Sequence, residues 1–147
     1  YTAVILTNGE VENYWEASNL NKKQLVGSSP SIDNFFYTKD IIKTISNKGY
    51  EAGIKEIEQN SKKYSLRENL IERYGYKFLF EKKTNLAIDL FKLNLHFFPN
   101  STNGYYYTSE AYRVSGQKEK AIEYLKLYLE KEPEDNEAQL KYKLLIK

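Results

Sequence analysis

Few residues of this chain could do chemistry. His96 is the single histidine among 147 residues, and there is no cysteine. A catalytic pair of histidines, a multi-histidine metal site and thiolate ligation are therefore excluded. Carboxylates are paired at Glu130 and Glu132 and again at Glu134 and Asp135, but acid–base work would need them in a cleft. We expect a solvated face and a helix cap there, a packing or surface role for His96, no metal site and no cofactor.

The elements that must position any functional side chain are indicated by a repeat of 34 residues. Seven residues match seven others found one period later, small with small and large with large. The first set is Gly75, Phe78, Ala87, Ile88, Phe91, Leu95 and Pro99, and the second is Ser109, Tyr112, Ala121, Ile122, Leu125, Leu129 and Pro133. This period and pattern resemble the tetratricopeptide repeat, a helix–turn–helix unit that stacks into arrays.

The predicted fold is mainly α. A tetratricopeptide-like domain over 38–147 should contain about three helical hairpins, at 38–64, 66–98 and 102–132, and a capping helix at 136–146. The first hairpin is a degenerate repeat, in which Ile41, Ile42 and Ile45 form an apolar stripe at helical spacing and Gly53 stands one period before Ala87. Three units and a cap are enough to bury a continuous core.

Single residues should shape these units. Two helices approach closely only where side chains are small, which predicts Gly75 against Ala87 and Ser109 against Ala121. The second hairpin should begin with a capping box formed by Ser65 and Glu68. The last helix should cover the end of the array with an apolar face made of three leucines, Leu140, Leu144 and Leu145.

Residues 1–30 form a separate segment. Tyr1–Thr7 is short, apolar and β-branched, and Asn8-Gly9 follows, which predicts a strand and a turn. Val11–Val26 favours a short helix, and 27–31 has the composition of a linker. We expect this segment to be the end of an upstream domain. An apolar strand without a native neighbour would pair with another copy, so a homodimer through this strand is a further expectation.

A concave groove lined by the first helices of the hairpins is the candidate binding site. The residues expected to face it are Glu72, Tyr76, Phe80, Tyr106, Glu110 and Arg113, with Leu79 beside them. Tyrosine and arginine are common anchors of protein contacts. The two glutamates favour a basic or aromatic ligand segment. The alternative is that these rings only pack against the preceding hairpin.

A narrower resemblance covers nearly the whole chain. It is carried by Tyr1–Gly9 with the helix after it, Gly75-Tyr76, Ala87–Asn94, Phe98–Ser101 and Ser109–Tyr112. These stretches resemble the C-terminal end of bacterial serine hydrolases of the β-lactamase and penicillin-binding-protein-like class, some of which carry tetratricopeptide tails. The resemblance implies an upstream catalytic domain and a periplasmic or exported location.

That resemblance does not bring catalysis to this chain. Such hydrolases use a serine with a lysine three residues later and a Lys-Thr-Gly-like motif. Ser115 and Lys118 have the first spacing but fall at a predicted turn, and Lys83-Thr84 lacks the glycine. We therefore expect a non-catalytic scaffold or interaction region of a larger hydrolase. The alternatives are a free-standing adaptor that binds a peptide in its groove and, least favoured, a small enzyme.

Charge and hydropathy limit the partners. The chain has 22 basic and 20 acidic residues, a net charge of +2, which leaves no electrostatic footprint for nucleic acid. No apolar run is long enough to span a bilayer. The expected partner is a protein, a peptide or the upstream catalytic domain. Because the sequence begins at Tyr1 and contains no methionine, we expect a processed product or a fragment.

Overall fold

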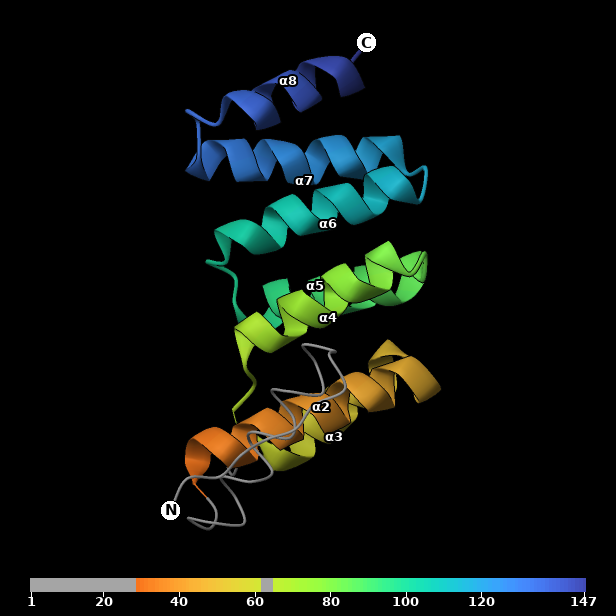
Figure 1. Ribbon diagram of the computed structural model, residues 1–147, viewed down its shortest axis with the longest axis vertical. Helices are drawn as coiled ribbons and strands as arrows, with labels where there is room; N and C mark the ends of the chain where they lie inside the picture. Colours follow the sequence, from red (N-terminus) through yellow and green to blue (C-terminus); the bar gives the residue numbers. More distant parts are fainter. Residues whose placement is uncertain (1–28, 62–64) are drawn as a thin grey trace, which may run out of the picture.

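The computed structural model describes residues 29–61 and 65–147, and this part of the chain is mainly α-helical (Figure 1). Its helices are α2 (Pro30–Lys48), α3 (Tyr50–Asn60), α4 (Glu68–Phe80), α5 (Thr84–Phe97), α6 (Thr102–Val114), α7 (Lys118–Lys131) and α8 (Asn136–Leu145). The predicted array of α-helices is therefore confirmed. The strand and helix expected before residue 27 lie outside the described residues.

The helices pack mainly on their neighbours in the chain. α2 packs on α3, α4 on α5 and α6 on α7, and α8 closes the series against α7. Figure 1 shows these pairs stacked along the long axis, from α2 near one end to α8 at the other. Among the described residues, no helix has the length and apolar character needed to cross a membrane.

The first helix begins earlier than the sequence pattern suggests. α2 starts at Pro30 rather than at Thr38, inside the stretch that we read as a linker. The Ser29 hydroxyl accepts a hydrogen bond from the Ile32 N–H at 3.4 Å and caps the helix. Proline at the first helical position costs nothing, because that N–H would have no helical partner. Serine and proline here therefore start a helix rather than a loop.

The predicted capping box at Ser65 and Glu68 is wrong. α4 begins at Glu68, and the residue at its N-cap, Arg67, makes no capping hydrogen bond with its side chain. The Ser65 N–H donates instead to Asn34 Oδ1 at 2.9 Å, and the Arg67 N–H donates to Thr38 Oγ1 at 3.0 Å. Side chains from α2 thus satisfy the amides just before α4, which ties the first hairpin to the second.

Two apolar clusters form the core. The first joins α2, α3, α4 and α5 and contains the predicted stripe Ile41, Ile42 and Ile45. The second joins α5, α6 and α7 around Phe91 and Tyr112. The half-buried Phe78 packs against both clusters, so the core is continuous along the stack.

Small residues mark the close approaches between helices. The Ser109 hydroxyl donates to the Ala121 carbonyl at 2.8 Å, as expected for that pair. Gly75 faces the ring of Phe91, one helical turn beyond Ala87. A Cβ placed on Gly75 would lie 2.5 Å from Phe91 Cε1. Glycine at this position is therefore required by the phenylalanine.

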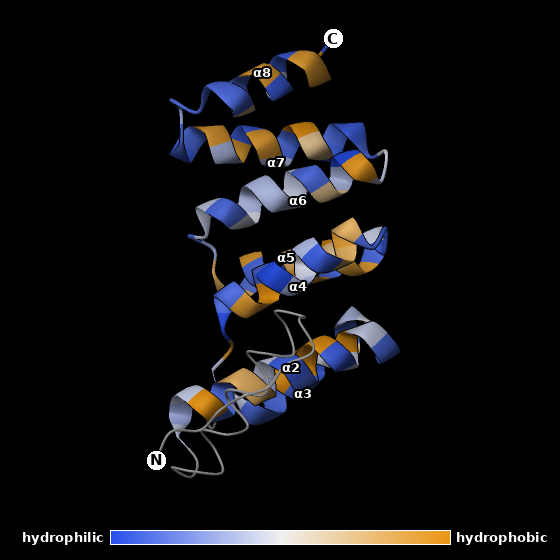
Figure 2. Cartoon of the chain, in the orientation of Figure 1, coloured by the Kyte–Doolittle hydropathy of each residue, from blue (hydrophilic) through white to orange (hydrophobic). Residues whose placement is uncertain are grey.

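The last helix covers the array with a different face from the one predicted. Leu140 and Leu144 are 59% and 61% exposed, and Figure 2 shows apolar residues on the outer C-terminal part of α8. Ala138 is fully buried and Leu145 packs on the second cluster. Lys141, one turn from each, turns inward toward α6. The prediction that the last helix buries all three leucines is therefore wrong for Leu140 and Leu144.

Candidate interaction groove

Three joined hollows run along α4 and α6. The first has a volume of about 390 Å³ and is lined by Tyr76, Leu79, Phe80, Tyr106, Glu110, Arg113, Val114, Glu137 and Lys141. The second, of about 310 Å³, is lined by Asn69, Glu72, Arg73, Tyr76 and Tyr107. The third, of about 680 Å³, lies where α4 and α6 begin, and includes Glu68, Asn69, Glu72, Ser101, Asn103, Tyr128 and Glu132.

Shared residues connect these hollows. Tyr76 borders the first and the second, and Asn69 and Glu72 border the second and the third. We call the whole the α4–α6 groove, the first hollow its aromatic end and the third its acidic end. All six candidate residues line it. Five of them lie at the aromatic end, while Glu72 lies in the middle and at the acidic end.

The aromatic end presents apolar side chains to solvent. Phe80 is 85% exposed and Tyr76 is 55% exposed. Figure 2 shows this apolar stretch at the C-terminal end of α4. Tyr106 behaves differently, because its ring lies 5.1 Å from that of Tyr128 and is half-buried. Tyr106 therefore packs within its own hairpin while it also lines the groove, whereas Phe80 is exposed to solvent.

Charges at the aromatic end are matched within the protein. Arg113 forms an ion pair with Glu110 at 2.9 Å. Lys141 lies 3.2 Å from Glu137 and 3.7 Å from Glu110, and also donates to the Tyr106 hydroxyl. Burial lowers the pKa of Lys141, but these hydrogen bonds and charges outweigh it and raise the pKa overall. Two cations thus face two carboxylates.

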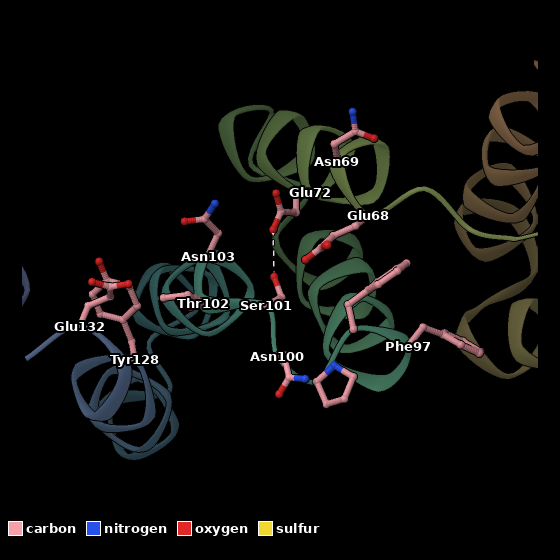
Figure 3. Close-up of a pocket in the computed structure, with 12 residues that line it drawn as sticks. Glu68, Asn69, Glu72, Phe97, Asn100, Ser101, Thr102, Asn103, Tyr128 and Glu132 are labelled. Atoms are coloured by element: carbon pink, nitrogen blue, oxygen red, sulfur yellow. Dashed lines mark hydrogen bonds between the residues drawn. The ribbon is translucent and has the colours of Figure 1, made fainter. Parts of the chain in front are cut away.

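The acidic end is different. Glu68, Glu72 and Glu132 line it (Figure 3), and no ion pair joins any of the three to a cation within 29–61 and 65–147. Glu72 accepts a hydrogen bond from the Ser101 hydroxyl at 3.1 Å. Burial raises the pKa of Glu72, the nearby charge of Glu68 adds to this, and the hydrogen bonds from Ser101 and Asn94 oppose it. The charged form of Glu72 is therefore less favourable here than it would be in water.

Between the two ends, the groove carries side chains that can donate hydrogen bonds. Asn69 and Arg73 line the middle hollow. The Arg73 Nε–H is buried and has no hydrogen-bond partner in the described structure. A buried donor without a partner is costly.

Three other residues of types that can take part in catalysis or metal binding make local contacts. His96 is exposed and its ring lies edge-on to Phe97 at 4.7 Å. The Ser115 hydroxyl donates to the Tyr112 carbonyl at 2.8 Å, in the turn between α6 and α7. Asp135 caps α8, and the hydrogen bond that it accepts from Tyr128 raises the pKa of Tyr128 to about 12. In the part of the chain that the structure describes, no acidic or histidine cluster is arranged to hold a metal ion.

Sequence reasoning missed several residues of the groove, and the repeat itself carried the signal. Some positions that line the groove recur at 34 residues: those of Asn69 and Arg73 on α4 have groove-lining equivalents on α6 and α8, and that of Phe80 has one on α6. The missed residues in these series are Asn69, Asn103 and Glu137, then Arg73, Tyr107 and Lys141, and finally Val114, which stands one period after the predicted Phe80. Comparisons of the sequence with protein-family models and with curated proteins found no match.

Proposed function

We propose that this chain is a non-catalytic, tetratricopeptide-type interaction region that binds a peptide or protein segment in the α4–α6 groove. The observation that carries the proposal is the exposure of Phe80 and Tyr76 at one end of a continuous groove. Hydrophobic side chains of this size are normally buried, and those at a concave surface mark interaction sites. The helical stack gives these side chains a rigid support.

Selection of binding peptides tests this proposal. A displayed library of random twelve-residue peptides would be selected on the immobilised 147-residue chain, and the affinity of selected peptides measured by fluorescence polarisation. Truncating an anchor residue should weaken binding at least about tenfold, so Phe80→Ala and Tyr76→Ala should each raise Kd by that factor or more.

Ile146→Ala is the matched control, because Ile146 is also exposed and apolar but follows α8 and does not line the groove. It should leave Kd unchanged. Failure to select any binder, or binders that are indifferent to both Phe80→Ala and Tyr76→Ala, would overturn the proposed function.

We also propose that this region belongs to a larger serine hydrolase, as the residue stretches quoted above resemble such a tail. The coding sequence upstream of Tyr1 tests the parentage. A Ser-x-x-Lys motif in a strand-and-helix context there would support it, and the absence of such a domain would leave the free-standing adaptor. Turnover of generic ester or β-lactam substrates by this chain alone would contradict the non-catalytic assignment.

A further inference from the structure

We infer that the α4–α6 groove takes an extended peptide segment with an arginine or lysine at its acidic end and a large apolar residue at its aromatic end. This inference rests on the proposed function and specifies the class of partner. Three features carry it: the unequal charge of the two ends, the exposed rings at one of them, and the length of α4 between them.

Charge distinguishes the two ends. At the aromatic end, Glu110 and Glu137 are paired with Arg113 and Lys141. The acidic end has three carboxylates, of Glu68, Glu72 and Glu132, without ion pairs among the described residues. The N-termini of α4 and α6 lie there as well, but each helix terminus supplies only about half a positive charge. The acidic end therefore stays negative, and it attracts a cationic side chain and repels an acidic one.

The aromatic end suits an apolar side chain. Phe80, Leu79 and Val114 line it, with Tyr76 at its boundary. The last turns of α4 and α6 carry these residues, so both walls of the hollow are apolar there. A second cation from a ligand would meet Arg113 and Lys141, whereas a phenyl or branched aliphatic group would cover the exposed ring of Phe80.

The separation of the two ends sets the spacing of the ligand residues. Glu72 and Phe80 stand eight residues apart on α4, which is about 12 Å along the helix axis. An extended chain advances about 3.3 Å per residue, so about four residues span this distance. Side chains four residues apart on an extended strand point to the same face. One peptide can therefore place both side chains in the groove.

The middle of the groove suits the backbone of such a peptide. Arg73 and Asn69 lie between the two ends and can donate to peptide carbonyls. Donors at this place favour an exposed backbone over a helical ligand, whose carbonyls are already hydrogen-bonded.

Synthetic peptides test the inference on the 147-residue chain. The reference peptide has arginine and phenylalanine separated by three small residues, RSGSF, with serine flanks and a fluorescent label. We expect the change of its arginine to glutamate to weaken binding at least about tenfold. A peptide with two intervening residues, which puts the side chains on opposite faces, should lose a similar factor.

A charge swap in the protein completes the test. The double variant Glu68→Lys with Glu132→Lys leaves the hydrogen bond of Glu72 intact and should reverse the preference, so that the glutamate peptide binds better than the arginine peptide. The matched control is Glu119→Lys with Glu130→Lys, which changes the net charge equally at exposed positions of α7 outside the groove. It should keep the preference for arginine.

Three results would overturn the inference: equal affinity for the arginine and glutamate peptides, no effect of the charge swap, or no binding of RSGSF up to about 1 mM, the weakest affinity class considered. If library-selected peptides still depend on Phe80 in those cases, the proposed function stands and only the partner class falls. If they do not, both fall.

Discussion

Replacing Phe91 with alanine should lower the free energy of unfolding of this chain by about 3–5 kcal/mol, the range for large aromatic residues in well-packed cores. Phe91 is completely buried and lies in the second cluster with Ala87, Ala111 and Tyr112. Its ring also lies 5.7 Å from that of Tyr107. The truncation would leave a cavity where α4, α5 and α6 meet.

Urea unfolding followed by far-UV circular dichroism measures the effect. Because stacked repeats can lose cooperativity, tyrosine fluorescence should be recorded as a second probe of the same transition. The matched control is Phe80→Ala, the same chemical change at a position that is 85% exposed, which should cost less than about 0.5 kcal/mol. Equal losses for the two variants would contradict the packing described above.

Gly75 provides a sharper form of the same test. A Cβ on Gly75 would come 2.5 Å from the buried ring of Phe91, so Gly75→Ala should destabilise the chain by overpacking, about 1–3 kcal/mol. Without such a clash, replacing a glycine within a helix by alanine raises the free energy of unfolding by about 0.5–1 kcal/mol. In the Phe91→Ala background the obstacle is gone, and Gly75→Ala should become stabilising. A destabilising effect of the same size in both backgrounds would mean that the two residues do not meet.

Replacing Ser101 with alanine should lower the free energy of unfolding by about 2–4 kcal/mol, because a lost helix cap of about 1 kcal/mol adds to about 1–3 kcal/mol for the hydrogen bonds that the Asn94 and Glu72 side chains lose. The Ser101 hydroxyl accepts from the Gly104 N–H at 3.0 Å and so caps α6. It also accepts from the fully buried Asn94 side-chain amide at 3.1 Å and donates to Glu72. One hydroxyl therefore joins α4, α5 and α6.

Two controls separate these contributions. Ser29→Ala removes a cap from α2 without disturbing a buried amide, and should cost about 0.5–1 kcal/mol. Adding Asn94→Leu to Ser101→Ala removes the amide that the first substitution deprives of its hydroxyl partner, so the double variant should cost less than the sum of the two single variants. Additive losses, measured by urea unfolding, would show that the Asn94 and Ser101 side chains act independently.

The amino-acid sequence predicted the helices of the array well because their signals are local. Apolar residues at helical spacing marked Ile41, Ile42 and Ile45 as a buried stripe, which is confirmed. A helix cap was expected around Glu134 and Asp135, and Asp135 caps the last helix. These features depend on residues within one or two turns of one another, so no distant contact can override them easily.

The errors came where a distant element supplied the deciding contact. The start of α4 is held by Asn34 and Thr38 from α2, which no pattern around Ser65 could reveal. The rotation of α8 depends on Lys141 reaching Tyr106 and Glu110 on α6. A lysine that pairs inside the array changes which side of the helix is buried, and so leaves Leu140 and Leu144 in solvent.

By itself, the sequence determined the helical pairs, their 34-residue period and the positions that face inward, because hydrophobic spacing and small residues act over short distances. It also singled out six side chains that lie along one groove. Only the tertiary structure decided how those side chains share it, since residues of α4, α6 and α8 meet there from separate parts of the chain. At one end of the groove the carboxylates form ion pairs, and at the other end the carboxylates form none among the described residues. This difference depends on how the helices come together and not on any single helix.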